Sequence, residues 1–281
     1  MNDGGDWTCP MCRATVRTRY CDRCGEEPLP PNELTLRGMA EKALHASTSI
    51  DARTARSAWQ LVRYPGELTL AWTAGVRRAF VAPFQLFLIA NVLFFSLQWL
   101  TGENVFSSSL DSHLHHQDWS ELAQSLVARR LAQSHSDLAQ YGPVFDRAVV
   151  LNAKSMIVFM AVPFALLLPL VFVRARRPFM THVAFSLHLY TFMLLVFCVA
   201  LLAAKLSAML GFGGLDARWL DNVLSIANLA VCAAYIHLAI GPVYGAEGAP
   251  RLVKAIVLAV AVAMIVVGYR FAMFLVTLYA T

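Results

Sequence analysis

The sequence predicts an all-α polytopic membrane protein, in which a small cysteine-bearing segment and amphipathic helices precede five transmembrane helices. Of its 281 residues, 58% are hydrophobic and 15% are charged, whereas soluble domains are about half apolar and a quarter charged. The hydrophobic residues fall in long blocks, and the mean hydropathy is +0.55. The net charge of +5 is spread along the flanks of these blocks instead of forming one basic face, so we expect no nucleic-acid partner.

Five apolar blocks are long enough to cross a bilayer, which requires about 20 residues at ~1.5 Å per residue. They are residues 79–100, 155–173, 182–204, 223–244 and 255–280. Pro163 and Pro169 should kink the second span. Residues 79–281 are therefore predicted to form a five-span membrane domain. Since no apolar signal-peptide region opens the sequence, residues 1–78 are expected to stay on one side of the membrane.

Lys and Arg in the short flanks predict the orientation of the spans, because such residues favour the cytoplasmic side. They gather before the first span, between the second and third, and between the fourth and fifth: Arg77, Arg78, Arg174, Arg176, Arg177, Arg251 and Lys254. We therefore expect a multi-pass protein of the bacterial inner membrane with a cytoplasmic N-terminus and a periplasmic C-terminus.

Helical patterns also occur outside the spans. In the outer loop, residues 101–154, Asp118 can cap one amphipathic helix that ends near Tyr141-Gly142-Pro143 and lies on the outer leaflet or covers the bundle. On the cytoplasmic side, residues 31–78 are predicted to form an amphipathic helical segment. It would comprise an apolar stripe at residues 36–44, a helix over 51–63, and a third helix over 67–78 that places Leu68, Trp72 and Val76 near the membrane surface.

The strongest motif is a pair of C-x-x-C knuckles, formed by Cys9, Cys12, Cys21 and Cys24. Four thiolates make a closed tetrahedral site, which is how zinc stabilises segments too small to have their own core. Two disulfides are the alternative, but they require an oxidising compartment. Residues 1–30 are therefore predicted to form a cytoplasmic zinc ribbon in which the zinc is structural, because four cysteines leave no open position for catalysis.

The order of several short segments is similar to that in a bacterial membrane family with a zinc ribbon, catalogued as domain of unknown function 3667. These segments are residues 20–25, 61–66, 75–78, Pro83, 182–188 and 269–270. Because that family is itself uncharacterised, the resemblance implies an architecture and no activity.

Ionisable groups inside spans are costly, and so they are candidate functional residues. These are His182, His188, His237 and Arg270. His188 and His237 are predicted at similar depth in the inner leaflet, where they could share an ion, a water or a head group, or could each bond a neighbouring helix. His182 lies at the boundary, where a lipid phosphate could bind. Arg270 is expected to reach outward to Asp221 as a structural anchor.

One further group of metal-binding residue types lies in the outer loop, at Asp111, His113, His115, His116 and Asp118. A histidine-rich loop is more often simply solvated than ligated to a metal.

Three classes of function remain. The first is a scaffold or assembly protein that binds a protein partner through its cytoplasmic N-terminal segment, and it requires no catalytic residues. The second is a transporter or lipid-handling protein that uses the intramembrane His and Arg residues, for which a homo-oligomer could enclose the path. The third is a membrane-embedded lipid enzyme, which the lack of a nucleophile or paired-carboxylate motif disfavours.

Overall fold

The computed structural model describes residues 6–18, 20–27, 52–102, 108–134, 136–210 and 218–281, apart from the side chains of 134, 154, 155 and 218–222. Within these residues, four helices are long and apolar enough to cross a membrane: α4 (Pro83–Thr101), α9 (Phe179–Met209), α10 (Arg218–Tyr244) and α11 (Gly248–Ala280). A bent helix pair raises the number to five if it counts as one span. Four to five apolar helices mark a membrane protein, in agreement with the predicted class.

The bent pair is the second predicted span. It consists of α7 (Leu138–Met156), a 3₁₀ turn η2 (Ile157–Met160) and α8 (Ala161–Val171), with an angle of 61° between its two parts. Pro163 explains the break, because its ring would clash with the carbonyl of Phe159 in a continuous α-helix. It is tolerated in the first turn of α8, where a backbone N–H has no helical partner. The predicted kink is therefore a sharp break.

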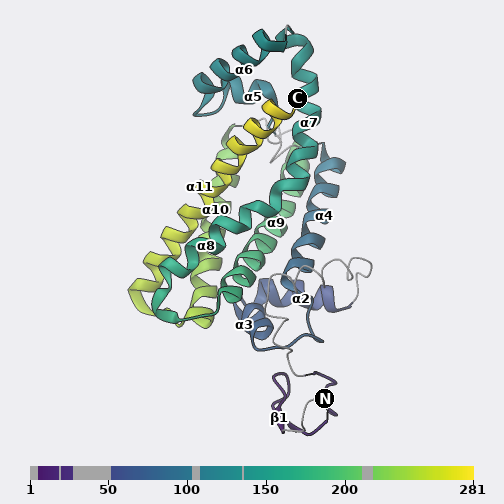
Figure 1. Cartoon of the computed structure of the whole chain (residues 1–281), viewed down its shortest axis with the longest axis vertical. Coiled ribbons are helices and arrows are strands. Elements are labelled where there is room, and N and C mark those ends of the chain that lie inside the picture. The colour runs from purple at the N-terminus through teal and green to yellow at the C-terminus, as the bar shows by residue number, and fades with distance from the viewer. Residues whose placement is uncertain (1–5, 19, 28–51, 103–107, 135, 211–217) are drawn as a thin grey trace.

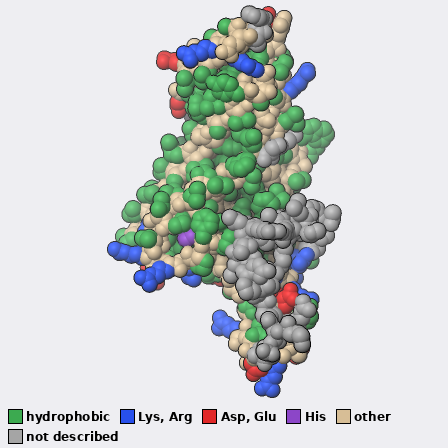
Figure 2. Space-filling model, in the orientation of Figure 1, with side chains coloured by type: hydrophobic (Ala, Val, Ile, Leu, Met, Phe, Trp, Pro, Cys, Tyr) green, Lys and Arg blue, Asp and Glu red, His purple; other side chains and the backbone are tan. Residues whose placement is uncertain are grey.

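Helix α9 is the centre of the bundle and packs against α4, α8 and α10. Almost every side chain from Met180 to Leu194 is buried, which explains why this helix is apolar all round. Figure 1 shows the long helices side by side, with the N-terminal segment and the C-terminus at opposite ends. On the face shown in Figure 2, hydrophobic side chains cover the middle, and Lys and Arg lie near the two ends.

The segment between α4 and α8 covers the end of α11. It forms three helices, α5 (Leu110–His115), α6 (Ser120–Ser134) and the first half of α7, whose apolar side chains pack on Phe274 and Leu278. The single predicted helix ending at Tyr141-Gly142-Pro143 is therefore wrong. Asp137 caps α7 by accepting a hydrogen bond from the N–H of Gln140 at 2.7 Å, so those three residues lie inside α7.

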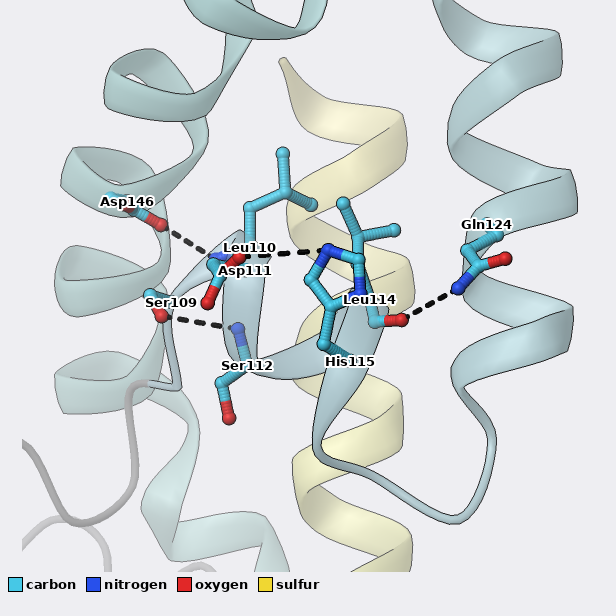
Figure 3. Close-up of polar contacts among 8 residues, drawn as sticks. All are labelled: Ser109, Leu110, Asp111, Ser112, Leu114, His115, Gln124 and Asp146. Carbon is cyan, nitrogen blue, oxygen red and sulfur yellow. Dashed lines mark hydrogen bonds and ion pairs between the residues drawn. The ribbon is translucent and has the colours of Figure 1, made fainter.

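Hydrogen bonds fasten α5 between its two neighbours (Figure 3). The Asp146 carboxylate of α7 accepts the N–H of Leu110 at 2.8 Å, and the Gln124 amide of α6 donates to the carbonyl of Leu114, also at 2.8 Å. His115 lies 3.7 Å from Asp111 on the surface. Among the described residues, the histidines of this loop do not gather with acids into a metal-binding group.

In the described part of the chain, helices α2 and α3 lie at the opposite end of the bundle. Helix α2 (Ala52–Arg63) forms as predicted, and the Ser57 hydroxyl accepts the N–H of Val81 at 2.9 Å, which ties α2 to the start of α4. Helix α3 (Glu67–Thr73) is shorter than the predicted 67–78. Gly75 has a φ of +98°, and the N–H of Val76 bonds back to the carbonyl of Ala71, which ends the helix.

Helix α3 packs against the bundle. Leu68 and Trp72 are buried in the same core as α9, and their position near the membrane surface stays a prediction. The predicted stripe at residues 36–44 lies outside the described residues.

Candidate metal centre and buried polar groups

The two cysteine knuckles repeat one backbone pattern. Strands β1 (Trp7–Thr8) and β2 (Thr15–Val16) pair antiparallel and bring the first knuckle into a tight turn. The N–H of Cys9 donates to the carbonyl of Ala14, and the N–H of Cys21 donates to Glu26 in the same way. The residue after each second cysteine, Arg13 or Gly25, has a positive φ and donates its N–H to the carbonyl of the first cysteine.

This pattern brings four sulfur atoms together. Cys9 and Cys24 Sγ lie 3.4 Å apart, Cys12 and Cys21 Sγ also 3.4 Å, and Cys12 and Cys24 Sγ 3.8 Å. All four atoms lie within 4.8 Å of one another, and all six cysteines of the chain are free thiols. The four sulfur atoms could therefore hold one metal ion, and they are not placed as two disulfides.

The surrounding groups shift the pKa values of the individual cysteine thiols in different directions. Burial opposes ionisation of Cys21, but the backbone N–H groups of Cys24 and Arg23 bond its sulfur and help to lower its pKa to about 7. A backbone bond from Glu26 also favours the thiolate of Cys24, yet burial and the neighbouring cysteine sulfurs raise its pKa to about 12. Four thiolates crowded together need a positive charge between them, which a metal ion supplies.

A buried carboxylate attaches this ribbon to the residues before α4. Glu26 is 0% exposed, and its Oε2 accepts the backbone N–H groups of Arg77 and Arg78 at 3.2 and 3.3 Å. The Arg77 guanidinium stacks on Trp72 at 4.0 Å. Gly25 lies so close to the Arg78 guanidinium that an added Cβ would collide with it. The ribbon that carries the four cysteines is thus packed against the residues just before α4.

The segment that follows the ribbon matches a known protein family. Residues 51–95 match the family model described as Protein of unknown function (DUF3667). This match confirms the resemblance over α2, α3 and the first part of α4, which we refer to below as the DUF3667 segment. The four cysteines lie outside it, so it says nothing about the metal. Neither the curated proteins nor the solved structures gave a match.

The DUF3667 segment supplies the partner of His188. Thr69 Oγ1 and His188 Nδ1 lie 2.8 Å apart, and both side chains are buried. His188 Nε2 has no hydrogen-bond partner among the described residues. Gly66 begins α3 with a φ of +90°, and an added Cβ would lie 2.6 Å from the Ala239 carbonyl of α10. Glycine therefore lets the DUF3667 segment approach the spans closely enough for this bond.

His182 and His237 have separate surroundings. His182 is 3% exposed, and its Nδ1 lies 2.9 Å from the hydroxyl of Tyr244, whose ring stacks on Phe172. This geometry directs the imidazole toward α10. His237 Nδ1 is buried and has no hydrogen-bond partner among the described residues. Among the described residues, no hydrogen bond joins the rings of His188 and His237, so their pairing stays a prediction.

Arg251 stabilises α10 where a proline interrupts its hydrogen bonds. Pro242 has no N–H, which leaves the carbonyl of Leu238 without its helical donor. Arg251 Nη2 donates to this carbonyl at 3.1 Å, and Nε donates to the carbonyl of His237 at 2.6 Å. The guanidinium lies against Gly241, where a larger residue would collide with it. Arg251 was predicted to help set the orientation of the spans. It also stabilises α10 by bonding these two carbonyl groups.

Arg270 contacts the residues just before α5. Its Nη2 donates to the Ser108 hydroxyl at 2.8 Å, while the predicted partner Asp221 lies among the side chains that the structure does not describe. Nearby, His113 is 1% exposed and shares a 3.2 Å hydrogen bond with the indole of Trp119. Burial, and then the charge of Arg270, lowers the pKa of His113 to about 4. This imidazole is therefore neutral near pH 7.

Sequence reasoning missed Glu26 and Thr69 as partners of the ribbon and of His188. Glu26 directly follows a knuckle, and a carboxylate there could have been read as a possible backbone cap. Thr69 had no comparable signal, because its contact joins residues 119 positions apart in the sequence.

Proposed function

We propose that this chain is a scaffold or assembly protein of the bacterial inner membrane. Its cytoplasmic N-terminal ribbon holds a structural zinc ion and binds a protein partner. The observation that carries this proposal is the closed set of four cysteine sulfurs, attached through Glu26 to the start of the membrane domain. Such a site stabilises a small surface and leaves no coordination position for a substrate.

The sulfur geometry supports zinc. A tetrahedron with metal–sulfur bonds of about 2.3 Å has sulfur–sulfur edges of about 3.8 Å. The sulfur–sulfur distances of 3.4, 3.4 and 3.8 Å given above are close to this value. The described part of the ribbon buries only Cys9, Val16 and Cys21 as apolar residues, so most of its folding free energy has to come from the metal.

The direction of insertion follows from charge and redox chemistry. The ribbon lies at the same end as Arg77 and Arg78, which favours a cytoplasmic location for both. Free thiols and zinc thiolates persist in that reducing compartment. An odd number of crossings would then place the C-terminus in the periplasm.

A protein partner is supported by the surface of the ribbon. Met11 and Tyr20 are 45% and 46% exposed, and the side chains of Arg13, Arg17 and Arg23 are exposed as well, with Arg17 paired to Asp6 at 3.3 Å. Apolar and arginine side chains are enriched in protein interfaces.

The test is capture of partners from native membranes by the tagged full-length protein. We expect discrete protein partners that are lost with Cys9→Ser, because this variant cannot close the metal site. Cys198→Ser is the matched control, since Cys198 is buried within α9, and it should retain the same partners. Identical partners for wild type and Cys9→Ser, or recovery of lipid alone, would contradict the proposal.

Transport or lipid handling is the second candidate, and the unpartnered Nε2 of the buried His188 favours it. However, a cavity between the spans, lined by Tyr190, Met193 and Val262, has a volume of only about 20 Å³. This volume holds about one water molecule and no solute. A stoichiometric solute or lipid that is released by His188→Leu but not by Cys9→Ser would favour this candidate over the scaffold.

A further inference from the structure

Helix α2 exposes an apolar stripe beside the face that packs on the bundle. Its buried side chains, Thr54, Ser57 and Leu61, follow one another at helical spacing, and the helix contacts α3, α4 and α9. On the neighbouring flank, Trp59 and Val62 are 66% and 50% exposed. These two residues are three positions apart and form one continuous surface, which we call the apolar stripe. A large exposed apolar surface of this kind indicates contact with something other than water.

A basic stripe follows the apolar stripe around α2. Arg56 and Arg63 lie two turns apart, and Arg53 precedes Arg56 by one turn. All three side chains are exposed. The helix itself contains no acidic residue, and the nearest acids in the sequence are Asp51 and Glu67, beyond its two ends. A tryptophan-bearing apolar stripe next to an arginine stripe is typical of helices that lie in the head-group layer of a membrane.

The place of α2 along the bundle fits that layer. The Ser57 hydroxyl accepts the N–H of Val81, which fixes α2 just before α4 begins at Pro83. The large apolar side chains of α4 that are more than a third exposed begin at Leu88, five residues or about 7.5 Å into the helix. A head-group layer is about 6 Å thick. When the exposed side chains of α4 meet lipid tails, α2 therefore lies beside the head groups, and Figure 1 shows it across the ends of α4 and α9.

We infer that α2 binds the membrane leaflet at this end of the bundle, with the apolar stripe inserted between lipids and the basic stripe bound to anionic head groups. Indole rings prefer the head-group level of a bilayer. Guanidinium groups donate paired hydrogen bonds to phosphate, and their charge favours lipids whose head groups carry a net negative charge. A protein partner would have to displace lipid from a helix at this depth, so the position of α2 favours lipid as the occupant.

Photo-crosslinking from position 62 of the full-length protein shows what covers this face. In nanodiscs with equal amounts of phosphatidylglycerol and phosphatidylcholine, we expect lipid adducts in which phosphatidylglycerol is enriched about fivefold, the factor that corresponds to one arginine near an anionic surface. Combining Arg56→Gln with Arg63→Gln should reduce the enrichment to nearly one, while lipid adducts still form. Arg129→Gln is the matched control, because it removes an exposed arginine from α6 at the other end of the bundle, and the enrichment should persist.

The same label at position 11 separates this face from the surface of the ribbon. Met11 is 45% exposed and should give no lipid adduct; its adducts report on the proposed protein partner, independently of those at position 62. In native membranes, adducts from position 62 with another protein, with another segment of the same chain or with water, in place of lipid, would overturn the inference. Equal lipid labelling from positions 11 and 62, equal labelling of the two lipids, or an enrichment that survives the double arginine substitution would also overturn it.

Discussion

The attachment of the ribbon to the membrane domain depends on one carboxylate, and Glu26→Ala removes it. Oε2 of Glu26 accepts two backbone N–H groups, from Arg77 at 3.2 Å and from Arg78 at 3.3 Å. Hydrogen bonds to a charged group contribute about 1.5–3 kcal/mol each, and these distances favour the lower value, so the two give about 3 kcal/mol. Oε1 is buried without a partner among the described residues, which costs about 1 kcal/mol.

The net loss of about 2 kcal/mol corresponds to a roughly 30-fold larger population of detached ribbon. Hydrogen exchange of the full-length protein measures this directly, because detachment exposes the amides of Arg77 and Arg78. We expect their exchange to accelerate by about that factor in Glu26→Ala, while the metal content stays unchanged. Glu27→Ala is the matched control, with the same charge lost one residue later. Unchanged exchange in Glu26→Ala would refute the proposed role of this carboxylate.

Three further predictions concern other parts of the chain. Ser57→Ala should destabilise the contact of α2 with the start of α4 by about 1–3 kcal/mol in thermal unfolding, because it leaves the buried N–H of Val81 without an acceptor; Ser125→Ala, at an exposed position of α6, should change little. Burial lowers the folded-state pKa of His113 to about 4 from 6.5, so stability should fall as the pH drops from about 6.5 to 4, by at most about 3 kcal/mol. His113→Gln should flatten this dependence, and an unchanged slope would contradict the assignment. Reporters fused after Arg177 and after Thr281 should be cytoplasmic and periplasmic, respectively; the same location for both would exclude the five-span topology.

The sequence was most informative where hydrophobicity alone decides the structure. Long apolar blocks predicted the spans because a bilayer requires about 20 such residues. The first span nevertheless starts at Pro83 instead of Ala79, since proline at the first helical position fixes the helix start. The cysteine spacing likewise predicted the sulfur cluster, because short turns between paired cysteines leave few arrangements.

Tertiary contacts could not be predicted in the same way. The bond between Thr69 and His188 depends on Gly66 allowing α3 to approach α10, and no local pattern encodes that approach. The three helices of the outer loop depend on packing against the end of α11, so the Tyr141-Gly142-Pro143 turn signal was overridden by the Asp137 cap and by burial of Phe145.

X-ray absorption at the zinc edge of the purified full-length protein tests the structural zinc site most directly. We predict about one zinc per chain, bound by four sulfur atoms at about 2.3 Å, with no oxygen or nitrogen ligand. Protein purified without chelators that contains no zinc would contradict the structural site. A zinc ion with a water or nitrogen ligand in place of one sulfur would contradict the closed site on which the scaffold function rests.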